Sequence, residues 1–156
     1  MIKFRFITDP GFSSWLIRWW SDSEYSHVDL ALPDGTFLGA RLDGGVQIRP
    51  NDYILPTKEL WLGLELGTDL ESKIYDYAKS KIGTPYDWRN ILSFGFDQDY
   101  HSGEHGYICS VFAYDILKAF NVQPIRLAYS SQCTPGDLTL SLNFVETTAW
   151  PVAQNA

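Results

Sequence analysis

The chain has 156 residues, of which 45% are hydrophobic and 15% are aromatic. This length and composition allow a sizeable core and exclude a disordered chain. Twelve Lys and Arg against nineteen Asp and Glu give a net charge of −7, which argues against nucleic acid as a partner. No run reaches the ~20 apolar residues that span a bilayer, and the N-terminus lacks the features of a secretion signal. We therefore expect a cytoplasmic protein with reduced thiols and no transmembrane segment.

The first half of the chain is dominated by strand patterns. Residues 2–8 alternate apolar with basic side chains, and residues 25–32 alternate again, with His27 and Asp29 on the less apolar face. Between these strands, a short helix is predicted whose apolar face would pack into the core, formed by Phe12, Trp15, Leu16 and Trp19. Three more strands are predicted at residues 36–41, 45–50 and 60–66, the last apolar enough to be central.

The second half is predicted to be mainly helical. Thr68 or Asp69 can cap a helix that ends at Gly83, and its inner face consists of Leu70, Ile74, Tyr77, Ala78 and Ile82. The stretch 106–121 predicts a second helix, with an apolar face of Cys109, Phe112, Ala113, Ile116, Leu117 and Phe120. A short helical turn at 135–138 and a strand at 142–152 complete the chain. This order predicts an α+β fold, a small antiparallel sheet or barrel packed against helices, as a single domain over residues 1–156.

Cys109 stands where the second predicted helix begins. The unpaired amides and the dipole at a helix N-terminus favour a thiolate, which is the nucleophilic form of cysteine. The amides of Cys109 and Ser110 could also stabilise a developing oxyanion. A cysteine on an apolar helix face is otherwise a small buried hydrophobe. The helix alone leaves both interpretations open.

His27 is the candidate base for that nucleophile. It lies on a strand, where an imidazole can point toward the end of a neighbouring helix. A Cys at a helix start and a His on a strand form the arrangement of papain-like thiol enzymes, which is recognised by geometry rather than by order along the chain. A lone His is otherwise a satisfied surface or core residue.

Four segments of the chain resemble, in order, the permuted papain-like hydrolases of the YiiX type, which are relatives of the NlpC-type cell-wall peptidases and of lecithin retinol acyltransferase. The segment YSHVDLAL is similar to that family's SHV strand, and KIGTPYDW is similar to its GxPYD segment. YICSVFAYDIL is similar to its YCSE nucleophile helix, and CTPGDL to its C-terminal turn. The resemblance spans nearly the whole chain and implies a circularly permuted, NlpC-type fold. It implies Cys109 as nucleophile, His27 as general base, and Tyr86 beside the nucleophile, where its hydroxyl could help to hold the oxyanion. Without the resemblance, Tyr86 would be interpreted as a turn-packing aromatic.

The chain departs from the family pattern at two positions. Such proteins often carry a glutamate, which orients the imidazole, on the strand after the His strand; here that position is Gly39. Asp29, Gln47 or a backbone carbonyl could take its place, and the sequence does not choose among them. Val111 stands where the family often has Glu after the Cys-Ser pair.

Metal and disulfide alternatives are less consistent with the sequence. His101, His105 and Cys109 are spaced by four and could hold Zn²⁺ on a continuous helix, but Gly103 and Gly106 interrupt the segment and favour a loop. We therefore predict no metal and no cofactor. Cys133, in a polar loop, is predicted to be non-catalytic, and nothing in its spacing from Cys109 indicates a disulfide.

The predicted function is a thiol hydrolase that cleaves an amide, ester or thioester through a Cys109–His27 dyad and a thioacyl-enzyme. Its substrate would be a small molecule, a peptide such as a cell-wall peptide, or a lipid-linked acyl group. One alternative is an acyltransferase that uses the same dyad. Another is a catalytically inactive binding domain, which the missing carboxylate at Gly39 would favour.

Overall fold

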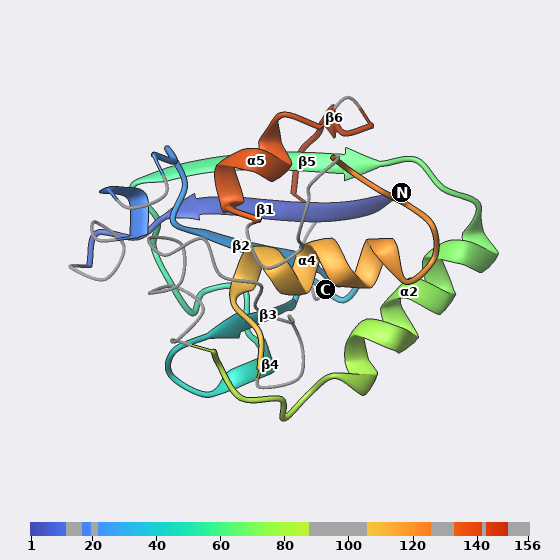
Figure 1. Ribbon diagram of the computed structural model, residues 1–156, viewed down its shortest axis with the longest axis horizontal. Helices are drawn as coiled ribbons and strands as arrows, with labels where there is room; N and C mark the ends of the chain where they lie inside the picture. The colour runs from blue at the N-terminus through green and yellow to red at the C-terminus, as the bar shows by residue number, and fades with distance from the viewer. Residues whose placement is uncertain (12–16, 20–21, 88–105, 126–132, 142, 150–156) are drawn as a thin grey trace, which may run out of the picture.

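The computed structural model contains an antiparallel sheet with helices against one face (Figure 1). It describes residues 1–11, 17–19, 22–87, 106–125, 133–141 and 143–149. Within these ranges the six-stranded sheet has the order β4-β3-β2-β1-β5-β6. The strands are β1 Ile2–Thr8, β2 His27–Ala31, β3 Phe37–Arg41, β4 Gly45–Arg49, β5 Lys58–Leu64 and β6 Val145–Glu146, and the helices are α2 Thr68–Ser80, α4 Cys109–Lys118 and α5 Pro135–Thr139. The predicted α+β class and antiparallel sheet are confirmed, and β5 lies inside the sheet between β1 and β6, as predicted.

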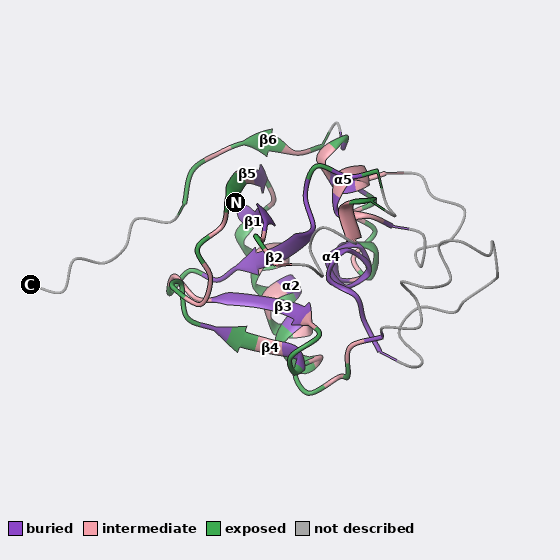
Figure 2. Ribbon diagram, turned by 90° about the vertical axis from the view of Figure 1, so that its left-hand side faces the viewer, coloured by how far each residue is buried: buried purple, intermediate pink, exposed green. Residues whose placement is uncertain are grey.

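The main core lies between the sheet and α4. Alternation along β1 and β2 sends one set of apolar side chains to this side, and each is at most 1% exposed: Ile2, Phe4, Phe6, Val28 and Leu30. Helix α4 packs against β2 and β3, and Figure 2 shows it buried on nearly all sides. Because α2 and α5 also pack against α4, Val111 and Tyr114 are buried although they lie outside the predicted apolar stripe.

The opposite face of the sheet carries buried charges. Lys3, Arg5, Asp29 and Arg49 are all less than 9% exposed. A buried charge needs partners, and these side chains have them. The Arg5 guanidinium, for example, forms an ion pair with Glu59 and lies 4.7 Å from the centre of the Phe37 ring. The segment 50–57, between β4 and β5, lines a groove of about 600 Å³ on this face together with Phe37 and Trp61. The less apolar face of β2 is therefore buried.

Helix α2 differs from the prediction at both ends. Its N-cap is Gly67, whose carbonyl accepts the amides of Leu70 and Glu71, so neither Thr68 nor Asp69 caps the helix. Glycine is an accepted N-cap because the extended backbone needed there costs it little. At the other end, Ile82 lies beyond the last turn and is 46% exposed instead of packing inward.

Two other predictions are corrected. Trp19, expected in the core, is 67% exposed; the rest of that predicted apolar face lies outside the described residues. Within residues 143–149, the described part of the predicted strand at 142–152, the strand is shorter than expected: β6 consists of two residues, which pair with Leu62 and Gly63 of β5. The short helix at 135–138 is confirmed as α5, and the capping box between Thr134 and Asp137 explains why it begins there.

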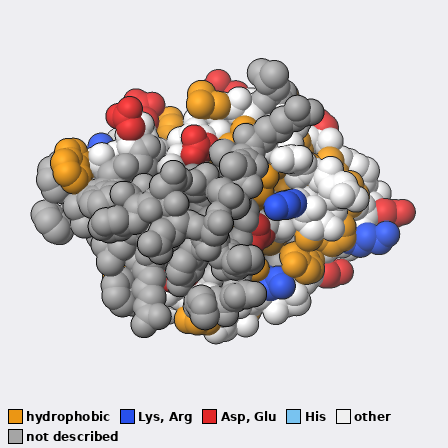
Figure 3. All heavy atoms as spheres, viewed as in Figure 1, with side chains coloured by type: hydrophobic (Ala, Val, Ile, Leu, Met, Phe, Trp, Pro, Cys, Tyr) orange, Lys and Arg blue, Asp and Glu red, His pale blue; other side chains and the backbone are white. Residues whose placement is uncertain are grey.

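No helix in the described part of the chain is long and apolar enough to cross a membrane. On the face of the molecule in Figure 3, the described acidic, basic and hydrophobic side chains are interspersed.

Candidate active site

Cys109 is the first residue of α4. The preceding Ile108 is extended, no side chain caps this end of the helix, and the first turn has no acidic residue. The amides of this turn are therefore not consumed by a capping side chain, and the helix dipole favours negative charge beside them. Cys109 is 4% exposed and is a free thiol. The apolar face of α4 and the thiol at its start are thus parts of one buried surface, and packing does not exclude chemistry.

Tyr86 is brought to Cys109 by the chain that precedes α4. A short parallel bridge joins Tyr86 to Tyr107, with the Asp87 amide donating to the Tyr107 carbonyl at 3.2 Å and the Tyr107 amide donating to the Pro85 carbonyl at 3.0 Å. Gly106 has a φ of +142°, and a Cβ there would lie 2.5 Å from the Pro85 oxygen. This close approach requires glycine. The PYD segment and the start of α4 are therefore one structural unit.

Burial raises the pKa of the Tyr86 phenol, and the charge of Cys109 raises it further. The phenol therefore stays protonated over the physiological range and keeps a hydrogen to donate. Its electrostatic interaction with Cys109 shows that the phenol lies near the thiol.

His27 interacts with both an acidic group and the thiol. Its Nε2 lies 2.8 Å from Oδ1 of Asp29, and Cys109 lies close enough to raise the pKa of the imidazole. Burial favours the neutral ring, but the charge of Asp29, followed by that of Cys109, outweighs burial and raises the pKa of His27 to about 9. The ring is therefore an imidazolium at neutral pH.

Asp29 is the partner that orients this ring. It is 1% exposed, and its two oxygens are both bonded: Oδ1 to His27, and Oδ2 to the hydroxyl of Tyr53. Burial alone would raise the pKa of Asp29, but the charge of His27 and the hydrogen bonds from His27 and Tyr53 hold it below its usual value. A buried carboxylate with these partners keeps its charge and fixes the imidazole.

Gly39 leaves the space that Asp29 occupies. The strands β2 and β3 pair Leu30 with Leu38, so the next facing pair in this register is Asp29 with Gly39. A Cβ on Gly39 would lie 2.2 Å from Oδ1 of Asp29, a separation that no side chain can have. The carboxylate beside the imidazole therefore comes from β2, and position 39 on β3 is left without a side chain.

The other candidates from the sequence fall elsewhere. The side chain of Gln47 lies against Gly44 and has no hydrogen bond to His27. Val111 is fully buried in α4. His101 and His105 lie outside the described residues. In the part of the chain that is described, no group of three or more His, Cys, Asp and Glu side chains could hold a metal ion.

Cys133 supports the start of α4 through its backbone. Its carbonyl accepts the hydroxyl of Ser110 at 2.5 Å, and Ser110 is fully buried. Burial raises the pKa of the Cys133 thiol, and the charges of Asp137 and Cys109 raise it further. Both cysteines are free. A protonated, fully buried thiol is a poor nucleophile.

Two groups at this site were not found from the sequence. Tyr53 lies in the segment NDYILP, which has the composition of a loop and carries no spacing that points to His27. Arg41, at the end of β3, affects the pKa of Asp29, Tyr53 and Tyr86 through its charge. Only the tertiary fold brings these two side chains to the site, so no local pattern could reveal them.

A crystal structure of the metalloprotein YiiX from Escherichia coli O157:H7 is similar to this chain, with a TM-score of 0.75. The two share 15% sequence identity, and the match covers 96% of this chain and 97% of the YiiX chain. A likeness at this identity establishes the fold alone. No protein-family model and no curated protein matches the chain. The chain therefore has a YiiX-like α+β fold, as the resemblance of the four segments implies.

Proposed function

We propose that residues 1–156 form a single domain of permuted papain-like fold that acts as a thiol hydrolase, with Cys109 as nucleophile and His27 as general base. The observation that carries the proposal is the interaction of one buried imidazole with both Asp29 and Cys109, at the start of α4. A nucleophile, a base within reach and a third group that orients the base are the parts that nucleophilic catalysis requires. In this proposal, Asp29 is the group that orients the base.

The reaction begins with His27 as an imidazolium, because its pKa is raised to about 9. The positive ring and the helix N-terminus stabilise negative charge on Sγ of Cys109. Sγ attacks the acyl carbon, and collapse of the oxyanion breaks the bond to the leaving group, which takes a proton from His27. Water then gives a proton to His27 and attacks the thioester carbon, which releases the acid and restores the thiolate. Because Nε2 is bonded to Asp29, Nδ1 is the nitrogen that exchanges these protons.

Three donors are available for the oxyanion in this mechanism. The backbone amides of Cys109 and Ser110 lie in the first turn of α4, where helix geometry leaves amides without intrahelical partners. The third donor is the Tyr86 hydroxyl, which stays protonated because burial raises its pKa. Donors fixed before the reaction stabilise the charge as it forms.

The substrate is an amide, ester or thioester, with a cell-wall peptide and a lipid-linked acyl group as the two classes that the family resemblance implies. An acyltransferase would use the same residues and would deliver the acyl group to an acceptor other than water. Product analysis with and without an added acceptor alcohol separates these two reactions.

A metal is not part of the proposal, although the similar YiiX structure is described as that of a metalloprotein. The described residues do not fit a metal, since no three His, Cys, Asp and Glu side chains among them form a cluster. His27 and Asp29 also face each other at 2.8 Å through Nε2 and Oδ1, which occupies atoms that a metal would need. The proposed hydrolysis uses no metal at any step.

The inactive-domain alternative loses its main support, because the carboxylate absent from Gly39 is supplied by Asp29. The decisive experiment measures iodoacetamide alkylation of each cysteine by peptide mass spectrometry across pH. At pH ~6 we expect Cys109 to react at least tenfold faster than a free thiol, because the neighbouring imidazolium and the helix N-terminus favour negative charge on its sulfur. His27→Gln should remove most of that advantage.

Cys133 in the same chain is the internal control, since burial raises its pKa and it should react slowly in every variant. If Cys109 reacted no faster than a free thiol, or if His27→Gln left its rate unchanged, the dyad would be refuted.

Tyr86→Phe tests the oxyanion role separately from nucleophilicity. Alkylation by iodoacetamide forms no oxyanion, whereas acylation by p-nitrophenyl acetate does. We expect Tyr86→Phe to leave the alkylation rate of Cys109 within about twofold and to slow its acylation about 10²-fold, the usual cost of losing one oxyanion donor. An equal effect on both reactions would assign Tyr86 to packing.

A further inference from the structure

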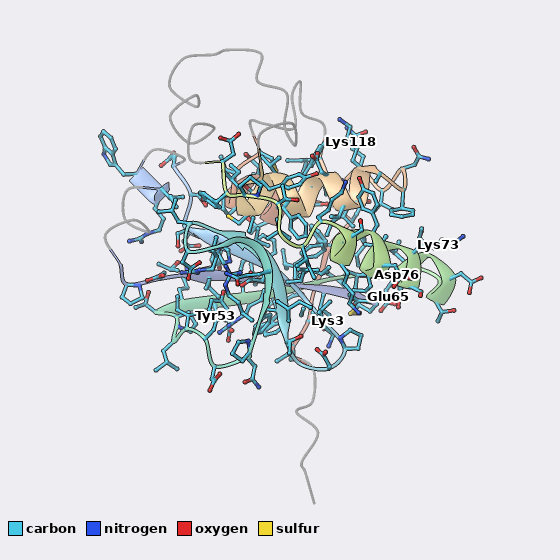
Figure 4. The ribbon with its side chains drawn as sticks, turned by 90° about the horizontal axis from the view of Figure 1, so that it is seen from below. Lys3, Tyr53, Glu65, Lys73, Asp76 and Lys118 are labelled. Carbon is cyan, nitrogen blue, oxygen red and sulfur yellow. The ribbon has the colours of Figure 1, made fainter. Side chains whose placement is uncertain are left out.

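The segment 50–57 reaches the site from the far side of the sheet. Figure 4 shows Tyr53 on the side of the sheet away from α4. The segment is fixed at both ends, with the Tyr53 amide donating to the Pro50 carbonyl at 3.3 Å and the Thr57 amide donating to the Thr8 carbonyl at 2.9 Å. The Tyr53 ring packs edge-on against Phe37 at 6.0 Å. These contacts hold the ring so that its hydroxyl meets Asp29.

Tyr53 supplies the only directed bond to Oδ2 of Asp29 that the described residues show, and His27 takes Oδ1. We infer that Tyr53 is a positioning residue that fixes the Asp29 carboxylate, and through it the His27 imidazole, from the opposite face of the sheet. The inference rests on the proposed function and deepens it. The linked groups run from Tyr53 through Asp29 and His27 to Cys109, and so connect a surface segment on one face with a helix on the other.

Tyr53 keeps its proton at neutral pH. Burial and the charge of Asp29 raise the pKa of its phenol above the usual value, although Arg41 and Arg5 act in the opposite direction. The hydroxyl therefore remains a donor to Oδ2 of Asp29 over the pH range in which His27 acts.

Among the described residues, the arginines near Asp29 direct their hydrogen bonds to other groups. Arg5 on β1 pairs with Glu59, and Arg41 on β3 pairs with Asp9 and Asp43. Arg49 on β4 bonds to the Gly39 carbonyl and to Asp43. The charge of Arg41 favours the ionised Asp29 carboxylate, whereas the direction of the carboxylate is fixed by His27 and Tyr53. Deleting the Tyr53 hydroxyl should therefore change the orientation of the Asp29 carboxylate without removing the positive charge near it.

Tyr53→Phe is the test, because it keeps the ring on Phe37 and removes the hydroxyl alone. Without its donor, a buried Asp29 is less stable as an anion, so its pKa rises and it takes a proton at higher pH. Protonated Asp29 no longer holds the imidazolium. We expect the low-pH limb of the Cys109 alkylation profile to move to higher pH, with the rate near pH 6 reduced about tenfold and the rates converging with those of wild type above pH 8.

Tyr75→Phe is the matched control, since the Tyr75 hydroxyl donates to β2 at the Ala31 carbonyl, at 3.5 Å, and not to Asp29. Its alkylation profile should equal that of the wild type. If Tyr53→Phe does not fold, Tyr53→3,5-difluorotyrosine keeps the hydroxyl as a stronger donor and should move the low-pH limb in the opposite direction.

The outcomes separate the inference from the proposed function. Slow alkylation of wild-type Cys109 would overturn the hydrolase proposal. Fast alkylation that depends on His27, together with wild-type profiles for both Tyr53 variants, would overturn the role of Tyr53 alone. A Tyr53→Phe variant whose rate falls equally at every pH would assign Tyr53 to folding, and the inference would again fail.

Discussion

Asp29→Asn is expected to slow acyl transfer from p-nitrophenyl acetate about 10³-fold while leaving the fold intact. An amide at position 29 removes the charge that holds the imidazolium and can present a donor to Nε2, which selects the wrong tautomer. The wild-type pKa of His27 is about 9 because Asp29 and Cys109 outweigh burial. Without Asp29, burial should dominate and bring the pKa of His27 below its ordinary 6.5.

The pKa change is measured by NMR titration of the imidazole nitrogens, with His27→Gln used to assign the signal. Asp34→Asn is the matched control, because Asp34 bonds only within its exposed turn, to Thr36. It should leave both the titration and the reaction unchanged. A His27 signal that titrates near 9 in the Asp29→Asn variant would contradict the assigned partner.

The interaction of His27 with Asp29 also makes the stability of the fold depend on pH. The folded-state pKa of His27 is raised above the unfolded value, so its contribution is fully present below pH ~6.5 and is lost as pH rises through about 9. The difference between the unfolded and folded pKa values of His27 corresponds to roughly 3 kcal/mol of folding free energy. In urea unfolding, the free-energy difference between wild type and Asp29→Asn should therefore narrow from pH 6.5 to 9.5.

Gly39→Ala is expected to impair both stability and reactivity, because its Cβ would lie 2.2 Å from Oδ1 of Asp29. The clash must displace either the strand or the carboxylate, at a cost of about 1–3 kcal/mol for overpacking. Displacement of Asp29 also frees the imidazole, so we expect Cys109 acylation to fall about 10²-fold. Gly67→Ala is the control for the acylation rate alone, since nothing lies within 4 Å of a Cβ there, whereas alanine at this N-cap lowers stability for a separate reason. Urea unfolding and the acylation rate are the two measurements.

A carboxylate swap tests the spatial argument directly. Asp29→Ala removes the two side-chain atoms that a Cβ at position 39 would meet, and leaves only an ordinary contact of 3.5 Å with the Val28 carbonyl. Gly39→Glu alone should be as damaging as Gly39→Ala, whereas Gly39→Glu combined with Asp29→Ala should recover part of the activity that Asp29→Ala loses. If the double variant is no better than Asp29→Ala, the strands do not share one carboxylate position.

The amino-acid sequence by itself determined the elements and the identity of the reactive candidates. Alternation along residues 2–8 depends only on which side chains avoid water, so it predicted β1 within its observed bounds. The apolar spacing in residues 106–121 likewise located α4 with Cys109 at its start. Prediction failed at Trp19 and Ile82, at the ends of elements, where periodicity does not reveal whether another element covers the face.

The tertiary structure alone decided how the imidazole is held. His27 and Asp29 are two residues apart on one strand. Asp29 can hold the imidazole because Gly39 on β3 has no side chain to displace the carboxylate and because Tyr53 donates a hydrogen bond to it from the far face of the sheet. Hydrogen bonds and close contacts between strands depend on register, which the period-two pattern of each strand leaves undefined along its length. The sequence therefore provided the candidate nucleophile and base, and the pairing of β2 with β3 decided which of the candidate groups holds the imidazole.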